Sequence, residues 1–372
     1  MTGFDIHRAA AVARKEVMHI LRDPFVLVLV LGLPVLLVVF FGFAIDFDVK
    51  NLKLAVYDRD NSRVSRQLVS VFESSGYFLP SPASSPSGAV GGLDSDRFAA
   101  ALLVERGFGR EVGRGAAARA QFVADGTDNS KAMAMLGYLP GISAAALRKF
   151  HGELPPDPVP LKSRYMYNPE LNSRWFVIPG LAVIIIGLLS ILMTALTVAR
   201  EWENGSMELL LSTPLRPAEI IAGKILPYVV LILGGVVFVN LVARFGFGVP
   251  FRGNLLLLLG GTLLYIVAAL SQGIVISVVT RQQQLAMQLS MISGLLPSLL
   301  LSGFIFPIES MPVFFRYFTI ILSPRWFMEM VRGITIRGAG AADLAVPLLA
   351  LAVLSAVLLT AAFKRFKTDL EP

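Results

Sequence analysis

Long uninterrupted runs of apolar residues dominate the pattern along this chain. A helix needs about 20 mostly apolar residues to cross the roughly 30 Å of bilayer hydrocarbon, and several runs reach or approach that length. The pattern predicts an α-helical polytopic membrane protein with six transmembrane helices, an even number that leaves both termini on one side. The predicted spans are residues 25–45, 176–199, 225–243, 255–280, 285–306 and 344–363.

Residues 46–174, between the first and second predicted spans, have the mixed pattern of a water-exposed domain. Strands that alternate with helices are typical of α/β folds, so we predict an α/β extracytoplasmic domain inserted here. Stretches rich in Pro, Ser and Gly at 80–92 and 155–160 predict loops. The periodicity of apolar residues predicts strands at 52–57, 100–104 and 120–123, and helices at 61–75 and 129–150.

Residues 1–24 precede the first span and are predicted to form a cytoplasmic amphipathic helix at the membrane interface. The alternative is a solvated helix that makes no membrane contact. The first span, residues 25–45, is too long for the apolar core of a signal peptide and no small-x-small cleavage site follows it, so we interpret it as a retained signal anchor. The apolar stripe of the amino-terminal helix consists of Ile6, Ala10, Ala13, Val17 and Leu21.

Composition and charge agree with this topology. The chain is 55% hydrophobic and 16% charged, against about 45–50% and about 25% in soluble domains. Its net charge is +7, and its basic residues cluster beside the first and last spans, as the positive-inside rule predicts for cytoplasmic termini. We predict a multi-pass protein of the cell inner (plasma) membrane with no nucleic-acid partner. The flanking basic residues are Arg14, Lys15 and Arg22 before the first span and Lys364, Arg365 and Lys367 after the last.

One connection departs from the positive-inside rule. Four arginines lie between the fifth and sixth spans, on the side that six-span alternation places outside. The same segment, residues 307–340, is rich in Phe, Trp and Met and is broken by prolines. It is therefore predicted to form short re-entrant or interfacial helices instead of a free loop. The arginines are Arg316, Arg325, Arg332 and Arg337.

Several kinds of chemistry are excluded by residues that the sequence lacks. Without cysteine it has no disulfide, thiolate metal site or cysteine nucleophile, and its three scattered histidines predict no metal site. Gly223-Lys224 is not a phosphate-binding loop, because Ala218 stands where that loop needs glycine, so this chain alone is not expected to hydrolyse ATP. The acidic loop 125–130 lacks the spacing of a calcium loop and is interpreted as a turn and helix cap.

Charged residues are missing from the cores of the predicted spans. An ion-coupled transporter usually keeps such residues, although each costs at least about 2.5–3.5 kcal/mol at the membrane centre. Their absence disfavours secondary transport. The deepest polar side chains, Asn240, Gln272 and Gln288, are interpreted as interhelical hydrogen-bonding groups in preference to substrate contacts.

Residues 200–219, between the second and third spans, have the pattern of a docking element. Gly205 is predicted to break the helix and Ser206 to cap a new one. Thr213 followed by Pro214 predicts a second helix start that leads toward the third span. A short cytoplasmic helix with charged and apolar faces suits docking, and an ordinary interfacial loop helix is the alternative. Its predicted apolar strip is Met207, Leu210 and Leu211, beside the charged Glu208.

The same stretch closely resembles the signature of type-2 ABC exporter permeases. The resemblance rests on Arg-Glu-x-Glu-x-Gly-Ser-x-Glu-x-Leu-Leu beginning at Arg200, on Thr213-Pro214-Leu215, and on Glu219-Ile220-Ile221-Ala222-Gly223-Lys224. Residues 302–312 and 322–333 agree with it as well. The order of elements also resembles that of one subgroup of this family, which is tied to export of drugs and hydrophobic compounds. That order is one span, a large extracytoplasmic domain and five further spans.

The resemblance implies a permease that pairs with a second permease, identical or homologous, and with a cytoplasmic ABC ATPase subunit that binds ATP and Mg. No cofactor is expected on this chain, and a periplasmic adaptor is a further candidate partner. Substrate would pass along an interface lined by the first, second and fifth spans. The implied ATPase-coupling residues are Glu201, Glu203, Gly205, Ser206, Met207, Glu208, Leu210, Thr213 and Pro214, with Arg14, Lys15 and Glu16 of the amino-terminal helix packed beside them.

Two other classes stay open from the sequence. A membrane-anchored receptor or assembly protein would act through the extracytoplasmic domain without an ATPase, although six spans exceed what an anchor needs. An ion-coupled secondary transporter would need the intramembrane charges that are missing. We favour the exporter permease, for which the sequence names no substrate-binding residue.

Overall fold

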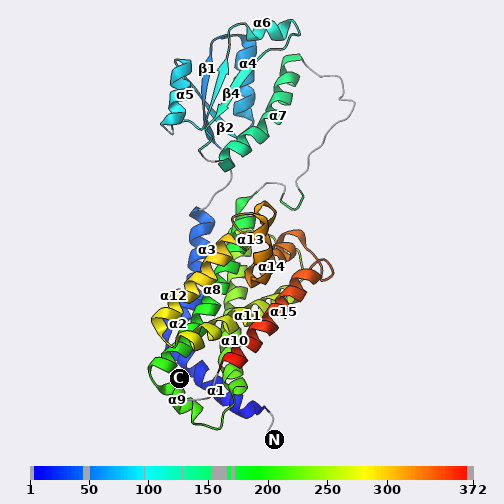
Figure 1. Ribbon diagram of the computed structural model, residues 1–372. Coiled ribbons are helices and arrows are strands. Elements are labelled where there is room, and N and C mark those ends of the chain that lie inside the picture. Colours follow the sequence, from blue (N-terminus) through cyan, green and yellow to red (C-terminus); the bar gives the residue numbers. More distant parts are fainter. Residues whose placement is uncertain are drawn as a thin grey trace. The chain divides into compact units, whose positions relative to one another are not determined.

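The computed structural model describes residues 4–44, 51–95, 97–127, 129–151, 166–168 and 172–366. The chain divides into two compact units, which are described separately (Figure 1). Residues 47–164 form one unit, and residues 1–46 together with 165–372 form the other. The loop predicted at 155–160 lies outside the described residues.

The unit of residues 47–164 is built on a four-stranded sheet with the order β2-β1-β3-β4 (Figure 1). β1 (Leu52–Asp58) lies between β2 (Phe78–Pro82) and β3 (Ala100–Val104) and is parallel to both, whereas β4 (Ala120–Ala124) is antiparallel to β3. The helices of this unit are α4 (Arg63–Ser74), α5 (Pro86–Asp94), α6 (Phe108–Gly113) and α7 (Asn129–His151).

The two faces of this sheet bury different residues, because strand side chains alternate between faces. Leu54 of β1 and Leu102 of β3 join a core that also includes side chains of α4, α6 and α7. Ala55 and Ala101, their neighbours in the same strands, pack against Ala89 of α5. The sheet therefore carries one large helical layer and, on its other face, a single helix over small side chains.

The stretch at 80–92, predicted to be a loop, is instead the end of β2 and most of α5. Among the described strands, β2 pairs with β1 alone and is an edge strand, where a proline that cannot donate a backbone hydrogen bond is tolerated. Ser85 then accepts a hydrogen bond from the Gly88 N–H, and Pro86 occupies the first turn of α5. The prediction was wrong because edge strands and helix starts both accommodate proline.

Asp60, just after β1, fixes the start of α6. Its carboxylate oxygens accept hydrogen bonds from the backbone nitrogens of Gly107 (2.7 Å) and Gly109 (2.8 Å). Hydrogen bonds from the Ser62 side chain and from these N–H groups favour the ionised form, so the pKa of the Asp60 carboxyl lies below its usual 3.8. The ionised carboxylate therefore stabilises this turn.

Replacing Asp60 with asparagine is expected to speed hydrogen exchange in α6, because a charge-assisted hydrogen bond is lost. In the unsubstituted protein the ionised Asp60 carboxylate contributes its full stabilisation of this turn above a pH of 3.8. That stabilisation is lost as the pH falls through the lower pKa of the folded state. Exchange of residues 107–113 in the full chain, compared with α4, measures the effect. Identical exchange in both proteins at neutral pH would refute this role.

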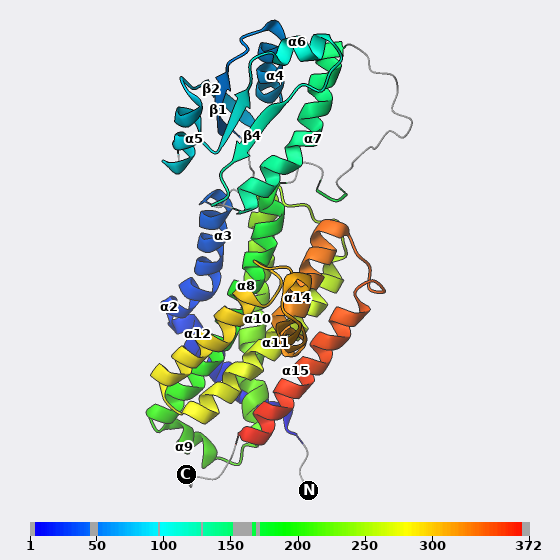
Figure 2. The same ribbon diagram turned by 45° about the horizontal axis from the view of Figure 1, so that its top comes forward.

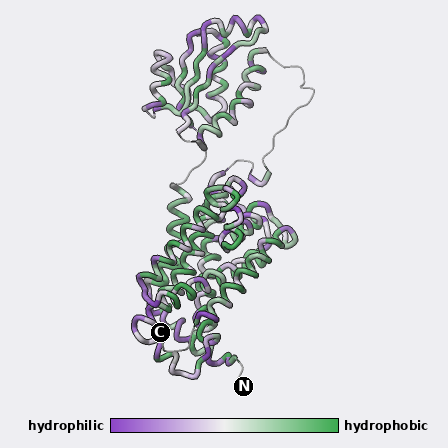
Figure 3. The backbone as a smooth tube through the Cα atoms, in the orientation of Figure 1, coloured by the Kyte–Doolittle hydropathy of each residue, from purple (hydrophilic) through white to green (hydrophobic). Residues whose placement is uncertain are grey.

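The other unit is a helical bundle. Among its described residues, four helices are long and apolar enough to span a membrane: α8 (Ser173–Glu203), α10 (Pro217–Phe247), α11 (Leu255–Thr280) and α15 (Ala345–Arg365). α8 lies inside the bundle in both views (Figure 2) and is the most buried of the four. Hydrophobic residues run along all of these helices (Figure 3). Apolar side chains such as Val230, Leu263 and Val353 are exposed on α10, α11 and α15, and an apolar outer surface of this kind is suited to a bilayer.

The first predicted span is helical from residue 24 to residue 44, as α2 (Pro24–Leu27), η1 (Val28–Gly32) and α3 (Leu33–Ala44). η1 is a π-helical turn, and Pro34 explains its place. In a regular helix the Pro34 ring would clash with the carbonyl of Val30 and could not donate to it, so a widened turn accommodates the proline. Residue 45 lies outside the described residues.

α12 (Gln283–Leu300) occupies the fifth predicted span but ends at Leu300 instead of at residue 306. The following residues bend, and Gly303 has a φ of +83°, a left-handed conformation that favours glycine. The predicted end was wrong because the sequence stays apolar beyond the helix. With 18 residues at about 1.5 Å each, α12 extends about 27 Å, close to the hydrocarbon thickness.

Short helices connect α12 to α15. They are η2 (Ile308–Ser310), α13 (Val313–Phe318), η3 (Thr319–Ile321), α14 (Ser323–Arg332) and η4 (Gly333–Arg337). α14 buries Phe327 and Met330 in the bundle core. Arg332 lies 3.9 Å from the centre of the Phe176 ring and donates a hydrogen bond to the Gly303 carbonyl oxygen. An aromatic ring and a backbone carbonyl therefore contact this arginine, whereas its Nε and Nη2 atoms are buried without a hydrogen-bond partner in the described part of the chain.

Candidate functional site

Helix α1 (Ile6–Arg22) packs along the beginning of α10. Ala9, Val12, Glu16 and Ile20 form its buried face, with the spacing of three or four residues that one helix face requires. Gly223 of α10 permits the close approach. A Cβ atom there would lie 2.6 Å from the Val12 Cβ and 2.8 Å from the Ala9 carbonyl oxygen.

Replacing Gly223 with valine is therefore expected to displace α1 from α10. We expect hydrogen exchange in residues 6–22 to rise severalfold while exchange in the α/β unit stays unchanged. Gly234→Val is the matched control, because Gly234 lies in the same helix and a Cβ there would meet no atom within 4 Å. Equal exchange of α1 in both variants would show that the close approach at Gly223 does not hold α1 in place.

Four charged side chains link α1, α8 and α10: Lys15, Glu16, Glu201 and Lys224, here called the ion cluster. Lys224 Nζ lies 2.9 Å from Glu16 Oε1 and 2.6 Å from Glu201 Oε2. Lys15 Nζ lies 2.6 Å from Glu201 Oε1. The side chains of Lys224 and Glu16 are each 2% exposed. Their burial is tolerable because two cations face two carboxylates.

A second contact fixes the amino-terminal end of α1. The Glu219 carboxylate accepts hydrogen bonds from the backbone nitrogens of Asp5 (2.9 Å) and Arg216 (3.0 Å). Arg8 donates a hydrogen bond to the carbonyl oxygen of Pro214. Since Glu219 lies in the first turn of α10, one carboxylate caps α10 and also anchors the residue before α1.

The end of α8 is also tied to α11 and α12. Glu203 accepts hydrogen bonds from the Gln283 backbone nitrogen (2.9 Å) and from the Gln283 side-chain amide. Arg281, at the end of α11, lies over the Trp202 ring, 4.6 Å from its centre. The end of α8 is therefore linked by polar or aromatic contacts to α1, α10, α12 and the residue that ends α11.

α9 (Ser206–Leu211) begins after Gly205, whose φ of +69° reverses the chain at little cost only for glycine. Gly205 is itself the N-cap, and Ser206 is the first helical residue. The Ser206 hydroxyl donates instead to the carbonyl oxygen of Glu201 (3.3 Å). The prediction that Ser206 caps the helix was wrong, because the left-handed glycine already ends α8 and starts α9.

The apolar strip of α9 faces its own bundle. Met207 is fully buried in the core, and Leu210 packs half-buried against that core. Glu208 is exposed and Leu209 is 72% exposed. The side chain of Leu211 is outside the described set. The face that a partner could reach therefore carries Glu208 and Leu209, and Met207 and Leu210 attach α9 to the bundle.

Thr213 and Pro214 do not start a helix, contrary to the prediction. α10 begins at Pro217, with Arg216 as its N-cap and Glu219 in the first turn. The Thr213 hydroxyl donates back to the carbonyl oxygen of Leu210. Thr213-Pro214 and Arg216-Pro217 are both possible helix starts. Only the second is followed by an acidic residue in the first turn, Glu219, which completes the helix start.

Arg14 is exposed on α1 and lines a shallow surface depression with His7 and Lys15. Ile6 and Leu21, both on the predicted apolar stripe, are 70% and 63% exposed. They lie off the buried face, so α1 has a second apolar surface that suits contact with lipid.

The three polar residues of the spans lie in different surroundings. The Gln272 side chain in α11 donates to the Ser293 hydroxyl in α12 at 3.2 Å. Asn240 donates to the Val236 carbonyl oxygen of its own helix and lines a cavity. Gln288 is exposed on α12.

Sequence reasoning did not identify Lys224 and Glu219 as buried ions, although both stood in the quoted motif. One signal was available. Glu16 shares its helix face with Ala9, Val12 and Ile20, and a carboxylate on a buried apolar face requires a cation nearby. That cation could not be located from the sequence, because Lys224 reaches Glu16 only through tertiary packing.

The long apolar helices define a multi-pass membrane protein. A family model matches residues 24–364, so the chain belongs to the family described as ABC-2 family transporter protein. It is thus a type-2 ABC permease, the membrane subunit of an ABC transporter, a class that is typically non-catalytic.

Three permeases of Escherichia coli match over most of their own length. The probable multidrug ABC transporter permease YbhS of Escherichia coli (strain K12) is 31% identical over 335 residues, 89% of each chain. The probable multidrug ABC transporter permease YbhR of the same strain is 29% identical over 97% of this chain and 98% of its own. The inner membrane transport permease YhhJ, also from this strain, is 31% identical over 84% of each chain.

Proposed function

We propose that this chain is the permease subunit of an ATP-driven exporter that moves hydrophobic or amphiphilic compounds across the bacterial inner membrane. The names of YbhS, YbhR and YhhJ support the substrate class and the location. ATP hydrolysis is assigned to a separate ABC ATPase chain, because this sequence has no phosphate-binding loop. The proposed topology has six spans with both termini in the cytoplasm.

The observation that carries the proposal is the junction of α1, α9 and α10. The ion cluster, Glu219 and Gly223 attach α1 to the bundle. Glu208 and Leu209 are exposed on α9, and the buried Met207 side chain anchors this helix in the bundle core. In the proposed mechanism, ATP binding closes the ATPase dimer, displaces α9 and biases the permease pair between two arrangements.

The test is uptake of a fluorescent hydrophobic dye by inverted membrane vesicles that contain this chain and its ATPase subunit. We expect uptake to require ATP and to persist when ionophores collapse the ion gradients. Uptake that follows an ion gradient without ATP would favour a secondary transporter. Partner binding through the α/β unit without any transport would favour a receptor or assembly protein.

The proposed membrane partner is a second permease, identical or homologous, and a periplasmic adaptor is a further candidate partner. α12 exposes apolar side chains such as Ile292 and Leu296, and Gln288 is exposed on the same helix. An amide that faces lipid lacks hydrogen-bond partners, whereas a neighbouring helix can supply them. We therefore assign α12, together with α3, to the interface along which substrate moves. The second predicted span, α8, is not assigned to it, because most of α8 is buried inside this bundle.

A photoreactive p-benzoylphenylalanine in place of Gln288 is expected to crosslink this chain to a second permease. The adduct should have about the mass of two permeases in membranes after illumination, whether the partner is identical or homologous. The same residue in place of Val353, exposed on α15, is the control and should give no such adduct. Adducts from Val353 but not from Gln288 would place the interface on α15 instead.

A further inference from the structure

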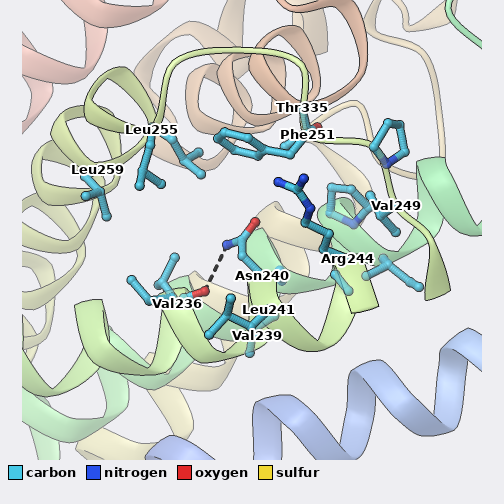
Figure 4. A pocket seen from close by; sticks show the side chains of 17 residues that line it. Val236, Val239, Asn240, Leu241, Arg244, Val249, Phe251, Leu255, Leu259 and Thr335 are labelled. Atoms are coloured by element: carbon cyan, nitrogen blue, oxygen red, sulfur yellow. Dashed lines mark hydrogen bonds between the residues drawn. The ribbon is translucent and has the colours of Figure 1, made fainter. Parts of the chain in front are cut away.

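A cavity of about 230 Å³ lies between α8, α10, α11 and the segment that follows α10 (Figure 4). Its inner wall includes Ile178, Val236 and Leu258, which are buried and apolar. Val237 and Leu241 also line it and are exposed on the outside of the bundle. The cavity therefore opens on the surface that a bilayer would cover, so that a ligand dissolved in lipid could enter it.

The lining changes in polarity along one face of α10. Val236, Asn240 and Arg244 follow one another at four-residue spacing, about one helical turn apart. Figure 4 shows the Asn240 and Arg244 side chains projecting from α10 into the cavity, toward Phe251. The cavity wall thus changes from an apolar group to an amide and then to a cation. An amphiphile has the matching order of parts: an apolar chain, a polar linkage and a charged head group.

Arg244 has no acidic neighbour at this site. None of the residues that line the cavity is an aspartate or a glutamate. In the described part of the chain, Arg244 forms no salt bridge. Arg244 is exposed, so its guanidinium, at the edge of an apolar cavity, is available to pair with the anionic group of a ligand.

We propose that this cavity binds one apolar chain of an amphiphile whose anionic head group pairs with Arg244. The volume supports a segment of a single chain, the rest of which would lie in the surrounding bilayer. It exceeds the about 150 Å³ of an apolar cavity that holds benzene and is below the about 300 Å³ at which pockets for drug-sized ligands begin. A carboxylate or phosphate head matches the planar guanidinium, which can donate two parallel hydrogen bonds to either group.

The proposed site is separate from the coupling junction and from the substrate interface assigned to α12. Binding can therefore be measured on the purified permease without its ATPase, and failure of the transport proposal would leave this result intact. Two sources supply the same chemistry: a free fatty acid, or an anionic phospholipid with one chain inserted. Competition between the two distinguishes them.

The probe is a palmitic acid that carries a diazirine on its chain, added to the permease in phosphatidylcholine nanodiscs. After illumination, mass spectrometry should locate saturable labelling on residues 236–259. We expect Arg244→Gln to reduce the labelling about tenfold, because a charge-assisted hydrogen bond is lost, and Arg244→Lys to retain most of it. Leu259→Trp, which fills the cavity, should also abolish labelling, whereas Leu263→Trp, one turn further along α11 and exposed, should not.

Competition by oleate with little competition by phosphatidylglycerol would identify a free amphiphile as the occupant, and the reverse would identify a membrane lipid. Either result supports the site. Labelling that is equal in the unsubstituted protein, Arg244→Gln and Leu259→Trp would overturn it. Equal labelling by a neutral palmityl alcohol probe would likewise overturn the assignment of an anionic head.

Discussion

Replacing Lys224 with methionine is expected to destabilise the bundle strongly and to release α1. The substitution leaves Glu16 and Glu201 as neighbouring carboxylates without the cation that lies 2.9 Å and 2.6 Å from them. Removing one partner of a buried ion pair typically costs about 3–5 kcal/mol. Thermal unfolding in detergent should show a lower Tm, and hydrogen exchange in α1 should rise.

Two matched variants separate this effect from a simple loss of charge. Lys15→Met removes a cation that is 41% exposed, so its cost should stay within about 1 kcal/mol. The double variant Glu16→Leu, Lys224→Met removes both members of the most buried pair and should recover much of the stability, because replacing a whole buried pair is often nearly neutral. A Lys224→Met protein as stable as Lys15→Met would contradict a structural role for the ion cluster.

Replacing Glu208 with lysine is expected to abolish ATP-coupled export while the protein stays folded and inserted. Glu208 is exposed on α9, so the substitution leaves the buried contacts of Met207 intact. In the proposed complex, the reversed charge repels the cation that Glu208 would meet on the ATPase, which lowers contact with α9. ATP-dependent uptake into inverted vesicles should fall by at least about tenfold, the equivalent of about 1.4 kcal/mol.

Ser212→Lys is the control for this prediction, because it adds a positive charge at an exposed position just beyond α9. We expect it to keep most of the transport. Purified yields and unfolding temperatures should be the same for both variants. Full transport by Glu208→Lys would remove Glu208 from the coupling surface and leave the outward face of α9 without its proposed role.

The apolar bundle was predictable because long helices have a strong local signal. The length and periodicity of an apolar run such as 255–280 can be read directly from the sequence. α11 accordingly begins and ends at the predicted residues. The ends of elements were less predictable where apolar composition continues past the helix, as after Leu300. Three prolines led to wrong predictions, Pro80, Pro86 and Pro214, because the effect of a proline depends on whether a strand is at an edge and where a helix starts.

The candidate site was predictable as a stretch of sequence but not as an arrangement of side chains. The signature beginning at Arg200 identified α9 and the ends of α8 and α10. It did not show that Met207 points inward, because a six-residue helix has apolar residues on more than one side. Nor could it show the ion cluster, because Glu16 and Lys224 are 208 positions apart and meet only in the folded bundle.

The central claim is that the outward face of α9 contacts an ATPase subunit. Because the chain has no cysteine, single cysteines at Glu208 and Leu209 can be paired with cysteines around the docking groove of the co-expressed ATPase. We predict disulfide crosslinks whose yield changes on ATP addition, and none from a cysteine at the buried Met207 or at Ser85 in the α/β unit. The absence of crosslinks from Glu208 and Leu209, in membranes shown to contain both proteins, would contradict the account.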